Sequence, residues 1–525
     1  MEISDLTPAE QRVWRAFATG AEVDFRAEAD GWGPERTLRA AVVRTLLLNG
    51  PTEPGEIAAV KVRGARVTGT LDLRYATVDS VVHLTHCRFE EAPELVGAHL
   101  RYVSLRDSEM PGLSVTRSRL DGSLRLTRCR FTGPVRLDGA QISGVLYLDE
   151  AELTVDAAAP PEQPGQPGQP GQPGPPGQPG PRGQSGQSGQ PRHSGQSGRG
   201  GPSGRPVLQL NQITVDDDVC ARGLRANGLI RLDGATIAGS LDLEDAELSN
   251  PGAHVLDAES LDVGANLLGR RLRAHGRIDL RGARIPGRVD LLRATLSNPG
   301  DTALRASSCV IGEIWLRGGA PVEGRLNLRR AEINQLHLEP EMLPDQVRLL
   351  DLTYTFLTPH EPAERRLPML ERDDDAFDPH AYEQLTAAYQ RIGDDRAARL
   401  VQLAKQRRHR STLPWYGRLW GRLQDAAVGY GFRPLRAAGW LLSLLAAGSV
   451  VFALEHPRPL KASEAPPFHP VFYTLDLLLP VISFGQESAF APSGWYQTLS
   501  YVLIVTGWIL ATTVVAGVTR TVSRQ

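Results

Sequence analysis

One unit of sequence recurs through the middle of this chain, and it limits the possible folds more than any other feature. Its copies read GARVTGTLDLRYATV, GAQISGVLYLDEAEL, GATIAGSLDLEDAEL, GARIPGRVDLLRATL and GAPVEGRLNLRRAEI. The close spacing of apolar positions is typical of very short strands, and the glycines are typical of tight corners. A unit this short cannot bury its aliphatic side chains alone. Copies must therefore stack as the coils of a solenoid that share one continuous core.

We therefore predict a mainly β protein whose centre, from Gly64 to about Leu357, is a right-handed β-helix. The partial copies VVHLTHCRF and GSLRLTRCRF fit the same pattern with cysteine at the small position. The wording of the repeat resembles the pentapeptide-repeat families, which form such solenoids. The small and large positions are looser here than in a strict five-residue code, so the number of faces per coil stays open. The solenoid is expected in two parts, 51–154 and 207–357.

Between these parts, residues 155–206 have the composition of collagen. Glycine recurs at every third residue from Gly165 to Gly189 and again from Gly195 to Gly204. This is a Gly-X-Y tract. A triple helix would need three chains in register, so we favour a disordered, polyproline-rich loop on the surface. Such a loop is tolerated because the entropy of loop closure grows slowly with length.

Helices are predicted on both sides of the solenoid. Residues 1–50 should form a helical cap, since Thr7, Pro8 and Glu10 match an N-cap, a first-turn proline and a capping-box acid. A second cap helix is expected from about Pro34 to Leu48. After the solenoid, residues 358–436 should form a charged linker, a helical neck and a basic amphipathic segment.

The neck contains two predicted helices separated at Gly393-Asp394, which we interpret as a packing platform against the end of the solenoid. A DNA-reading role is disfavoured because no basic recognition face accompanies the helices. The amphipathic segment that follows is predicted to lie on the anionic inner leaflet of a membrane, or alternatively to pack on the solenoid. Its aromatic and basic residues are Trp415, Arg418, Trp420 and Arg422.

Residues 437–525 are predicted to form a two-span transmembrane hairpin. Ala437–Leu454 and Thr498–Thr519 are uncharged and close to the length that a helix needs to cross a bilayer. A buried soluble helix is the alternative for the shorter segment. Basic residues precede the first span and follow the second, which predicts that both the N-terminal bulk and the C-terminus are cytoplasmic. We therefore expect a multi-pass protein of the cell membrane.

No catalytic, cofactor or metal site is expected. The formal net charge of -2 disfavours nucleic acid as a partner. The cysteines are far apart and read as small core residues in a reducing compartment; they are Cys87, Cys129, Cys220 and Cys309. Strand alternation in HLTHC would place His83 and Cys87 on one side and His86 on the other, which disfavours a metal site. The run Asp373–Asp375 precedes a predicted helix, where the helix dipole favours negative charge, so we interpret it as helix-stabilising and not as a metal site.

Several of these motifs together resemble a family of actinobacterial membrane proteins labelled "membrane-associated oxidoreductase". The similarity is carried by WGPERTLRAAVVRTLLL, the GARVTGTLDL-type repeats, AYEQLTAAYQRIGDDRAARLVQLAKQRR, GYGFRPLRAAGW and LDLLLPVISFGQ. It covers nearly the whole chain except the triplet insertion. The label implies redox activity, but no cofactor motif accompanies it in this sequence.

The C-terminal region is also similar to two-span potassium-channel pores, in which a re-entrant loop lies between the spans. That family's filter reads TVGYG and depends on stacked backbone carbonyls. In this chain Val481 lacks the threonine hydroxyl and Ser483 replaces the first glycine. Pro480 should end the preceding helix. We expect a pore-shaped loop without filter chemistry, formed by Pro480, Val481, Ile482, Ser483, Phe484, Gly485 and Gln486.

The leading functional hypothesis is a membrane-anchored cytoplasmic scaffold without a catalytic site. Its expected partners are membrane lipid and a protein that the sequence does not identify, and self-association as a homo-oligomer is left open. The first alternative is an oligomeric, channel-like membrane protein. The second is the oxidoreductase that the family label implies.

Overall fold

The structure is a computed structural model that describes residues 5–26, 31–154, 205–373, 377–412, 434–461, 466–479 and 483–522. Within the helices, the side chains of residues 410–412, 434–438 and 512–522 are not described. The chain divides into two compact units, Met1–Asn327 and Leu328–Gln525.

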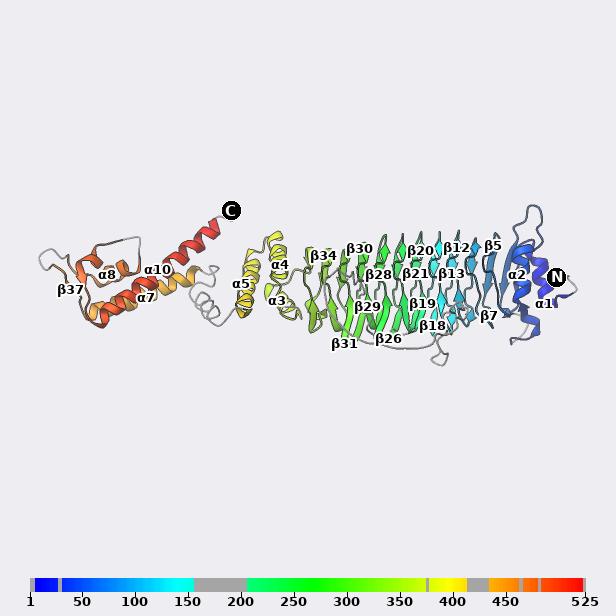
Figure 1. The fold of residues 1–525 in the computed structure, drawn as a ribbon, viewed down its shortest axis with the longest axis horizontal. Coiled ribbons are helices and arrows are strands. Elements are labelled where there is room, and N and C mark those ends of the chain that lie inside the picture. Colours follow the sequence, from blue (N-terminus) through cyan, green and yellow to red (C-terminus); the bar gives the residue numbers. More distant parts are fainter. Residues whose placement is uncertain are drawn as a thin grey trace, which may run out of the picture. The chain divides into compact units, whose positions relative to one another are not determined.

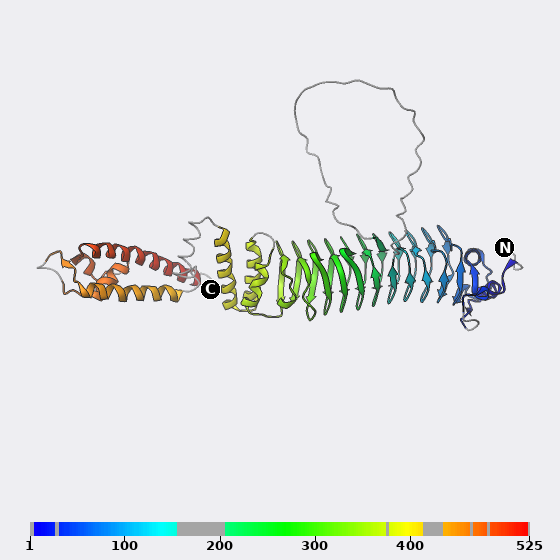
Figure 2. The same ribbon diagram turned by 90° about the horizontal axis from the view of Figure 1, so that it is seen from below.

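The chain forms a parallel β-solenoid of about 11 turns with helices toward its N- and C-terminal ends. Figures 1 and 2 show the strands of the first unit stacked coil upon coil. The predicted solenoid is confirmed, whereas the hand of its coil stays a prediction. The predicted collagen-like insertion falls almost entirely on residues 155–204, which lie outside the described residues.

Two parallel sheets run along the first unit. The strands of the first sheet are β1 (Glu22–Asp24), β3 (Ala59–Arg63), β5 (Thr77–Val78), β6 (Val81–Thr85), β8 (His99–Leu100), β9 (Val103–Ser104), β12 (Arg119–Leu120), β13 (Leu124–Arg125), β16 (Gln141–Ile142), β17 (Leu146–Tyr147), β20 (Thr214–Val215), β21 (Val219–Cys220), β24 (Thr236–Ile237), β25 (Leu241–Asp242), β27 (Asp262–Val263), β28 (Leu267–Leu268), β30 (Arg284–Asp290) and β32 (Val310–Leu316).

The second sheet has the same parallel arrangement. Its strands in the first unit are β2 (Thr37–Arg39), β4 (Arg66–Thr68), β7 (Arg88–Phe89), β10 (Glu109–Met110), β11 (Leu113–Ser114), β14 (Arg130–Phe131), β15 (Val135–Arg136), β18 (Glu152–Thr154), β19 (Pro206–Gln209), β22 (Arg225–Asn227), β23 (Leu229–Arg231), β26 (Glu247–Asp257), β29 (Arg273–Asp279), β31 (Thr295–Arg305) and β33 (Glu323–Asn327).

The pairing register gives the length of a coil. Leu124 pairs with Leu146, 22 residues further along the chain, and Val219 pairs in the same way with Leu241. Corners with positive φ separate the two sheets, and these recur every ten or eleven residues, as at His86, Gly97 and Asp107. A coil therefore consists of two half-coils, one in each sheet. In the regular region each half-coil contains two short strands, such as β8 and β9 in the first sheet and β10 and β11 in the second.

Aliphatic side chains fill the space between the sheets. Each inward position of one coil stacks on the equivalent position of the next, so the core is a set of apolar ladders. One such ladder, at most 4% exposed at any position, consists of Val103, Leu124, Leu146, Val219, Leu241, Leu267, Val289 and Ile314.

Departures from the regular coil gather at one position of the second sheet. Thr154, Asn227, Ser249, His275 and Ser297 occupy equivalent positions in successive coils. Directly after Ser249 and Ser297 come segments that do not follow the pairing, 250–253 and 298–301, and in the sequence the triplet insertion follows Thr154. They alternate with coils in which a single glycine takes this place. The triplet insertion therefore lies between β18 and β19 of the second sheet, at a position where other coils also carry extra residues.

The N-terminal helices are α1 (Pro8–Phe17) and α2 (Ala40–Asn49), with a short 3₁₀ helix, η2 (Pro34–Arg36), between them. The predicted capping box is confirmed. Thr7 Oγ1 accepts a hydrogen bond from the Glu10 amide, and the Glu10 carboxylate accepts one from the Thr7 amide. The prediction of one helix from Pro34 was wrong. Residues 37–39 instead pair with Arg66–Thr68 as β2, because the edge of the second sheet offers hydrogen bonds that an isolated first helical turn lacks.

The second unit begins with the strands β34 (Glu332–Leu338), β35 (Gln346–Arg348) and β36 (Thr353–Thr358), and with the 3₁₀ helix η3 (Pro340–Met342). The strands β34 and β36 pair in parallel. Three helices follow, α3 (Ala363–Glu371), α4 (Pro379–Arg391) and α5 (Asp395–Thr412). The helix α4 contacts β36, and α5 contacts both α3 and α4. The predicted helical platform with a break at Gly393 is thus confirmed.

The remaining helices of this unit are α7 (Pro434–Leu454), α8 (Pro470–Leu478), α9 (Gln486–Ala489) and α10 (Trp495–Val522). The short strands β37 (Arg458–Pro459) and β38 (Phe490–Ala491) pair in antiparallel fashion. The helices α7, α8 and α10 contact one another, so both predicted spans are helical and lie together as a hairpin around α8 (Figure 1).

Candidate functional site

The predicted pore-like loop follows α8, and only part of it is described. Pro480, Val481 and Ile482 lie outside the described residues. Ser483, Phe484 and Gly485 form an extended turn, and Gln486 opens the short helix α9. Gly485 has a φ of 80°, a left-handed conformation that favours glycine. A left-handed Gly485 therefore precedes α9 in the described part of the loop, and the predicted pore-like shape stays a prediction.

A buried carboxylate, Asp476, lies at the centre of this turn. Its oxygens accept hydrogen bonds from the backbone amides of Phe484 at 2.5 Å, Gln486 at 2.8 Å and Glu487 at 3.2 Å. Asp476 is only 5% exposed. Three amide donors offset the desolvation that a buried carboxylate would otherwise suffer.

The Gln486 side chain fixes the same loop from its other side. Its Oε1 accepts from the His469 amide at 3.2 Å, and its Nε2 donates to the Pro467 carbonyl at 3.2 Å. The loop is thus held to both ends of α8. A potassium filter presents carbonyl oxygens to an ion, whereas this turn presents amide hydrogens to its own aspartate. The sequence analysis missed Asp476 because a single acidic residue in the apolar run TLDLLLP gives no sign of the backbone amides that surround it.

The helical hairpin has a core of its own around α8. Phe452 from α7, Tyr473 and Leu477 from α8, and Leu503 from α10 are all buried there. The Phe452 and Tyr473 rings lie edge to face, with centroids 4.9 Å apart. This core explains why α7 and α10 keep together.

The outer surfaces of the same helices are apolar and exposed. Large hydrophobic side chains face outward on α7, at Trp440, Leu442, Val450 and Leu454, and on α10, at Trp495, Tyr501, Val502, Val505, Trp508 and Ile509. A helix with apolar side chains on all sides is normally covered by protein or by lipid.

Within the described part of the chain, none of the helices combines the length and the apolar character needed to cross a membrane. The predicted spans include residues 437–438 and 512–519, whose side chains lie outside the described residues. The predicted membrane-surface residues Trp415, Arg418, Trp420 and Arg422 also lie outside them, in the gap at 413–433.

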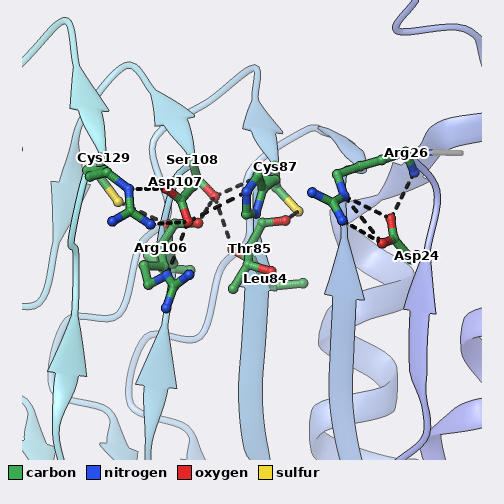
Figure 3. Close-up of polar contacts among 12 residues, drawn as sticks. Asp24, Arg26, Leu84, Thr85, Cys87, Arg106, Asp107, Ser108 and Cys129 are labelled. Atoms are coloured by element: carbon green, nitrogen blue, oxygen red, sulfur yellow. Dashed lines mark hydrogen bonds and ion pairs between the residues drawn. The ribbon is translucent and has the colours of Figure 1, made fainter. Parts of the chain in front are cut away.

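The prediction that His83 and Cys87 share a side was wrong. The strand β6 ends at Thr85, and His86 adopts a left-handed corner with a φ of 53°. The extra turn reverses the alternation, so His83 faces outward against the Tyr102 ring while Cys87 is buried. Figure 3 shows Cys87 beside Ser108, whose hydroxyl accepts from the Cys87 amide at 3.0 Å and donates to the Leu84 carbonyl at 3.1 Å.

Corner residues of neighbouring coils form an ion network around Asp107 (Figure 3). The Asp107 carboxylate accepts a hydrogen bond from Arg128 Nε at 2.6 Å and another from Arg106 Nε at 3.1 Å. His86 Nε2 lies 3.6 Å from Asp107 Oδ2. Burial alone would raise the pKa of Asp107, but the two arginines outweigh it and lower the pKa. The carboxylate stays ionised and links coils, which is a structural role.

The thiols are poor nucleophiles and poor metal ligands. All four cysteines are free, and burial raises the pKa to about 12 for Cys87, Cys129 and Cys309 and to about 11 for Cys220. A thiol with such a pKa is protonated at neutral pH. Among the described residues, no group of three or more His, Cys, Asp or Glu side chains could hold a metal ion. Of the Asp373–Asp375 run, Asp374 and Asp375 lie outside them, and Asp373 forms a β-bridge with Val347.

A buried arginine of α3 connects the helical platform to the strands before it. Arg366 is 1% exposed, and its guanidinium donates to the carbonyls of Leu338 at 2.6 Å and Pro359 at 2.7 Å. Tyr389 Oη donates to the Glu361 carbonyl at 2.6 Å. These bonds tie α3 and α4 to the last strands, as expected for a packing platform.

Comparison with protein-family models, with curated proteins and with solved structures finds no match to this chain in any of the three.

Proposed function

We propose that this protein is a membrane-anchored scaffold, in which the hairpin of α7 and α10 lies in the bilayer and the β-solenoid presents a surface to a protein partner in the cytoplasm. The observation that carries the proposal is the exposed apolar surface of α7 and α10. These helices already bury one side against α8, and they still expose large aliphatic and aromatic side chains, as at Leu442 and Val505. Contact with lipid chains would remove such an apolar surface from water.

The length of the two segments supports a spanning arrangement. Ala437–Leu454 contributes 18 uncharged residues and Thr498–Thr519 contributes 22. At about 1.5 Å per residue, segments of this length approach the roughly 30 Å of a hydrocarbon core. Trp440 and Trp495 lie near the ends of the segments, where amphipathic rings favour the headgroup zone.

The solenoid supports the scaffold half of the proposal through its geometry. Each coil contacts only its neighbours, which leaves long outer surfaces available to a partner. The irregular segments 250–253 and 298–301 emerge on one such surface, and in repeat proteins loops of this kind often mark the binding face.

The channel-like alternative receives less support. Two of the described loop residues, Phe484 and Gln486, direct their amides to Asp476 inside the hairpin. The oxidoreductase alternative rests on the family resemblance alone. Absorbance of the purified protein between 350 and 600 nm would detect flavin or haem, at roughly the wavelengths typical of such cofactors.

Extraction from membranes tests the anchor. Membranes from cells that express the full chain are washed with alkaline carbonate and floated on a density gradient. We expect the wild-type protein to float with the lipid. In the double variant Leu442→Arg, Val505→Arg, each arginine should disfavour insertion by about 3 kcal/mol, so the protein should move to the soluble fraction.

The matched control is Ile57→Arg, which places the same charge at a position of the first unit that is 74% exposed. This variant should float like the wild type. A wild-type protein that carbonate removes from the membrane would overturn the anchor.

A further inference from the structure

The positive charge of this chain is concentrated immediately before α7. Residues 396–436 contain ten lysines and arginines and a single acidic residue, Asp425, whereas the whole chain has 58 basic and 60 acidic residues. A basic cluster of this size next to an apolar helix is typical of segments that contact anionic lipid headgroups.

Among the described side chains, those of α5 up to His409 belong to this cluster. Ala397, Ala398 and Val401 bury the other side of the helix against its neighbours. Further along, Arg407 and Arg408 are exposed at the C-terminal end.

Contacts within the unit fix the direction of this end. Lys405 Nζ pairs with Glu383 of α4, and the His409 ring lies 5.6 Å from the Phe377 ring. The basic end is therefore held on a packed helix, and a rigid arrangement loses less entropy on binding than a flexible tail does.

We propose that the C-terminal turns of α5, through Arg407 and Arg408, bind the phosphate headgroups of anionic phospholipids in the leaflet beside the anchor. This inference rests on the proposed membrane anchor, because the hairpin keeps α5 within reach of one leaflet. A cluster that bound nucleic acid would also carry positive charge, but the adjoining apolar segment favours the lipid. The attraction should weaken with added salt, because surface charges are screened over about 8 Å at physiological ionic strength.

Fluorescence quenching tests the contact in the full chain. The exposed Gln406 is replaced by cysteine and labelled with a fluorophore, and the protein is reconstituted in nanodiscs that carry a nitroxide on the headgroup of phosphatidylcholine. One set of discs contains only phosphatidylcholine lipids, and the other also contains phosphatidylglycerol. We expect stronger quenching when phosphatidylglycerol is present, and loss of the difference at high salt.

Charge variants identify the residues. In the Arg407→Gln, Arg408→Gln variant, the equilibrium constant for headgroup contact should fall about 30-fold, since each basic residue near an anionic surface contributes about fivefold. The matched control, Arg396→Gln, Arg399→Gln, removes the same charge from exposed positions at the other end of α5 and should leave the quenching unchanged.

The outcomes separate this inference from the anchor. Protein that fails to enter the discs contradicts the anchor. Protein that enters the discs but is quenched equally with and without phosphatidylglycerol overturns the lipid contact alone. Binding of an oligonucleotide that requires Arg407 and Arg408, without any dependence on phosphatidylglycerol, would also overturn it.

Discussion

At the scale of single residues, a few carboxylates inside the fold differ in the groups that surround them. Glu10 and Asp476 are both carboxylates with almost no exposure, and both are surrounded by donors. Asp257 is different, because its neighbour in the next coil is a second carboxylate, Asp279. Opposite consequences for stability follow from these surroundings.

Glu10 should stabilise the fold at neutral pH. Burial opposes its ionisation, but hydrogen bonds from Arg39 and from the Thr7 amide outweigh burial and lower its pKa to about 2. A lowered pKa gives stability above the ordinary pKa of a glutamate, and this stability is lost as the pH falls toward 2. Glu10→Gln should therefore lower the free energy of unfolding by about 3 kcal/mol at pH 7. Denaturant titrations at pH 7 and pH 3 check this, and an undiminished effect at pH 3 would contradict it.

Asp257 should destabilise the fold at neutral pH. Burial raises its pKa, and Asp279 adds to the effect against the opposing influence of His254 and Arg231. A raised pKa means that stability is greatest below the ordinary pKa of an aspartate and is lost as the pH rises through the folded value. Asp257→Asn should raise the free energy of unfolding at pH 7, by up to about 1 kcal/mol. Melting curves at pH 7 and at pH 3.5 should differ between variant and wild type only at the higher pH.

At the scale of elements, stacking of neighbouring coils sets the register. Opposite charges alternate along one outer row of the second sheet, where Arg130 lies between Glu109 and Glu152, and Arg225 lies between Glu152 and Glu247. Each exposed pair contributes at most about 1 kcal/mol, but a shift by one coil would place like charges together. The pairing of Glu152 with Arg225 carries this pattern past the triplet insertion.

Gly276 shows how one coil makes room for the next. Its φ is 134°, and an added Cβ would lie 2.6 Å from the Asn250 carbonyl oxygen and 3.0 Å from that of Ala253. Gly276→Ala should therefore lower the free energy of unfolding by about 3 kcal/mol, from backbone strain and overpacking together. Chemical denaturation measures the change.

Shortening the neighbouring loop provides the control for Gly276. When residues 250–253 are replaced by one glycine, the clashing carbonyls are removed and only the backbone strain of alanine remains. The cost of Gly276→Ala should then fall to about 1 to 2 kcal/mol. An equal cost in both backgrounds would show that the loop does not press on this position.

At the scale of the whole molecule, the proposed anchor fixes which segments face each side of the membrane. The excess of basic residues before the first span and after the second predicts that both flanks lie on the cytoplasmic side and that the connector between the spans lies on the outer side. Cys87, Cys129 and Cys309 are buried, whereas Cys220 is only half-buried, so labelling is carried out in a Cys220→Ala background.

Cysteine labelling in intact cells tests this topology. Lys461→Cys should react with a membrane-impermeant maleimide added outside, and Arg408→Cys should react only after the cells are lysed. Both positions are exposed, so a lack of reaction reports the membrane and not burial. Labelling of residue 408 from outside would reverse the orientation.

The sequence by itself determined the parallel solenoid and the presence of helices toward both ends of the chain, but not where the solenoid begins, since β1 and β2 lie within the region predicted as a helical cap. Local chemistry was sufficient there, because recurring aliphatic positions, corner glycines and the Thr7–Glu10 capping box act over a few residues. Only the tertiary structure decided the 22-residue coil, the position in the second sheet that the irregular segments share, and the burial of Cys87. It also gave Asp476 its three amides. These features depend on contacts between residues far apart in the chain. A local sequence pattern does not determine which backbone groups form hydrogen bonds between coils or around a loop.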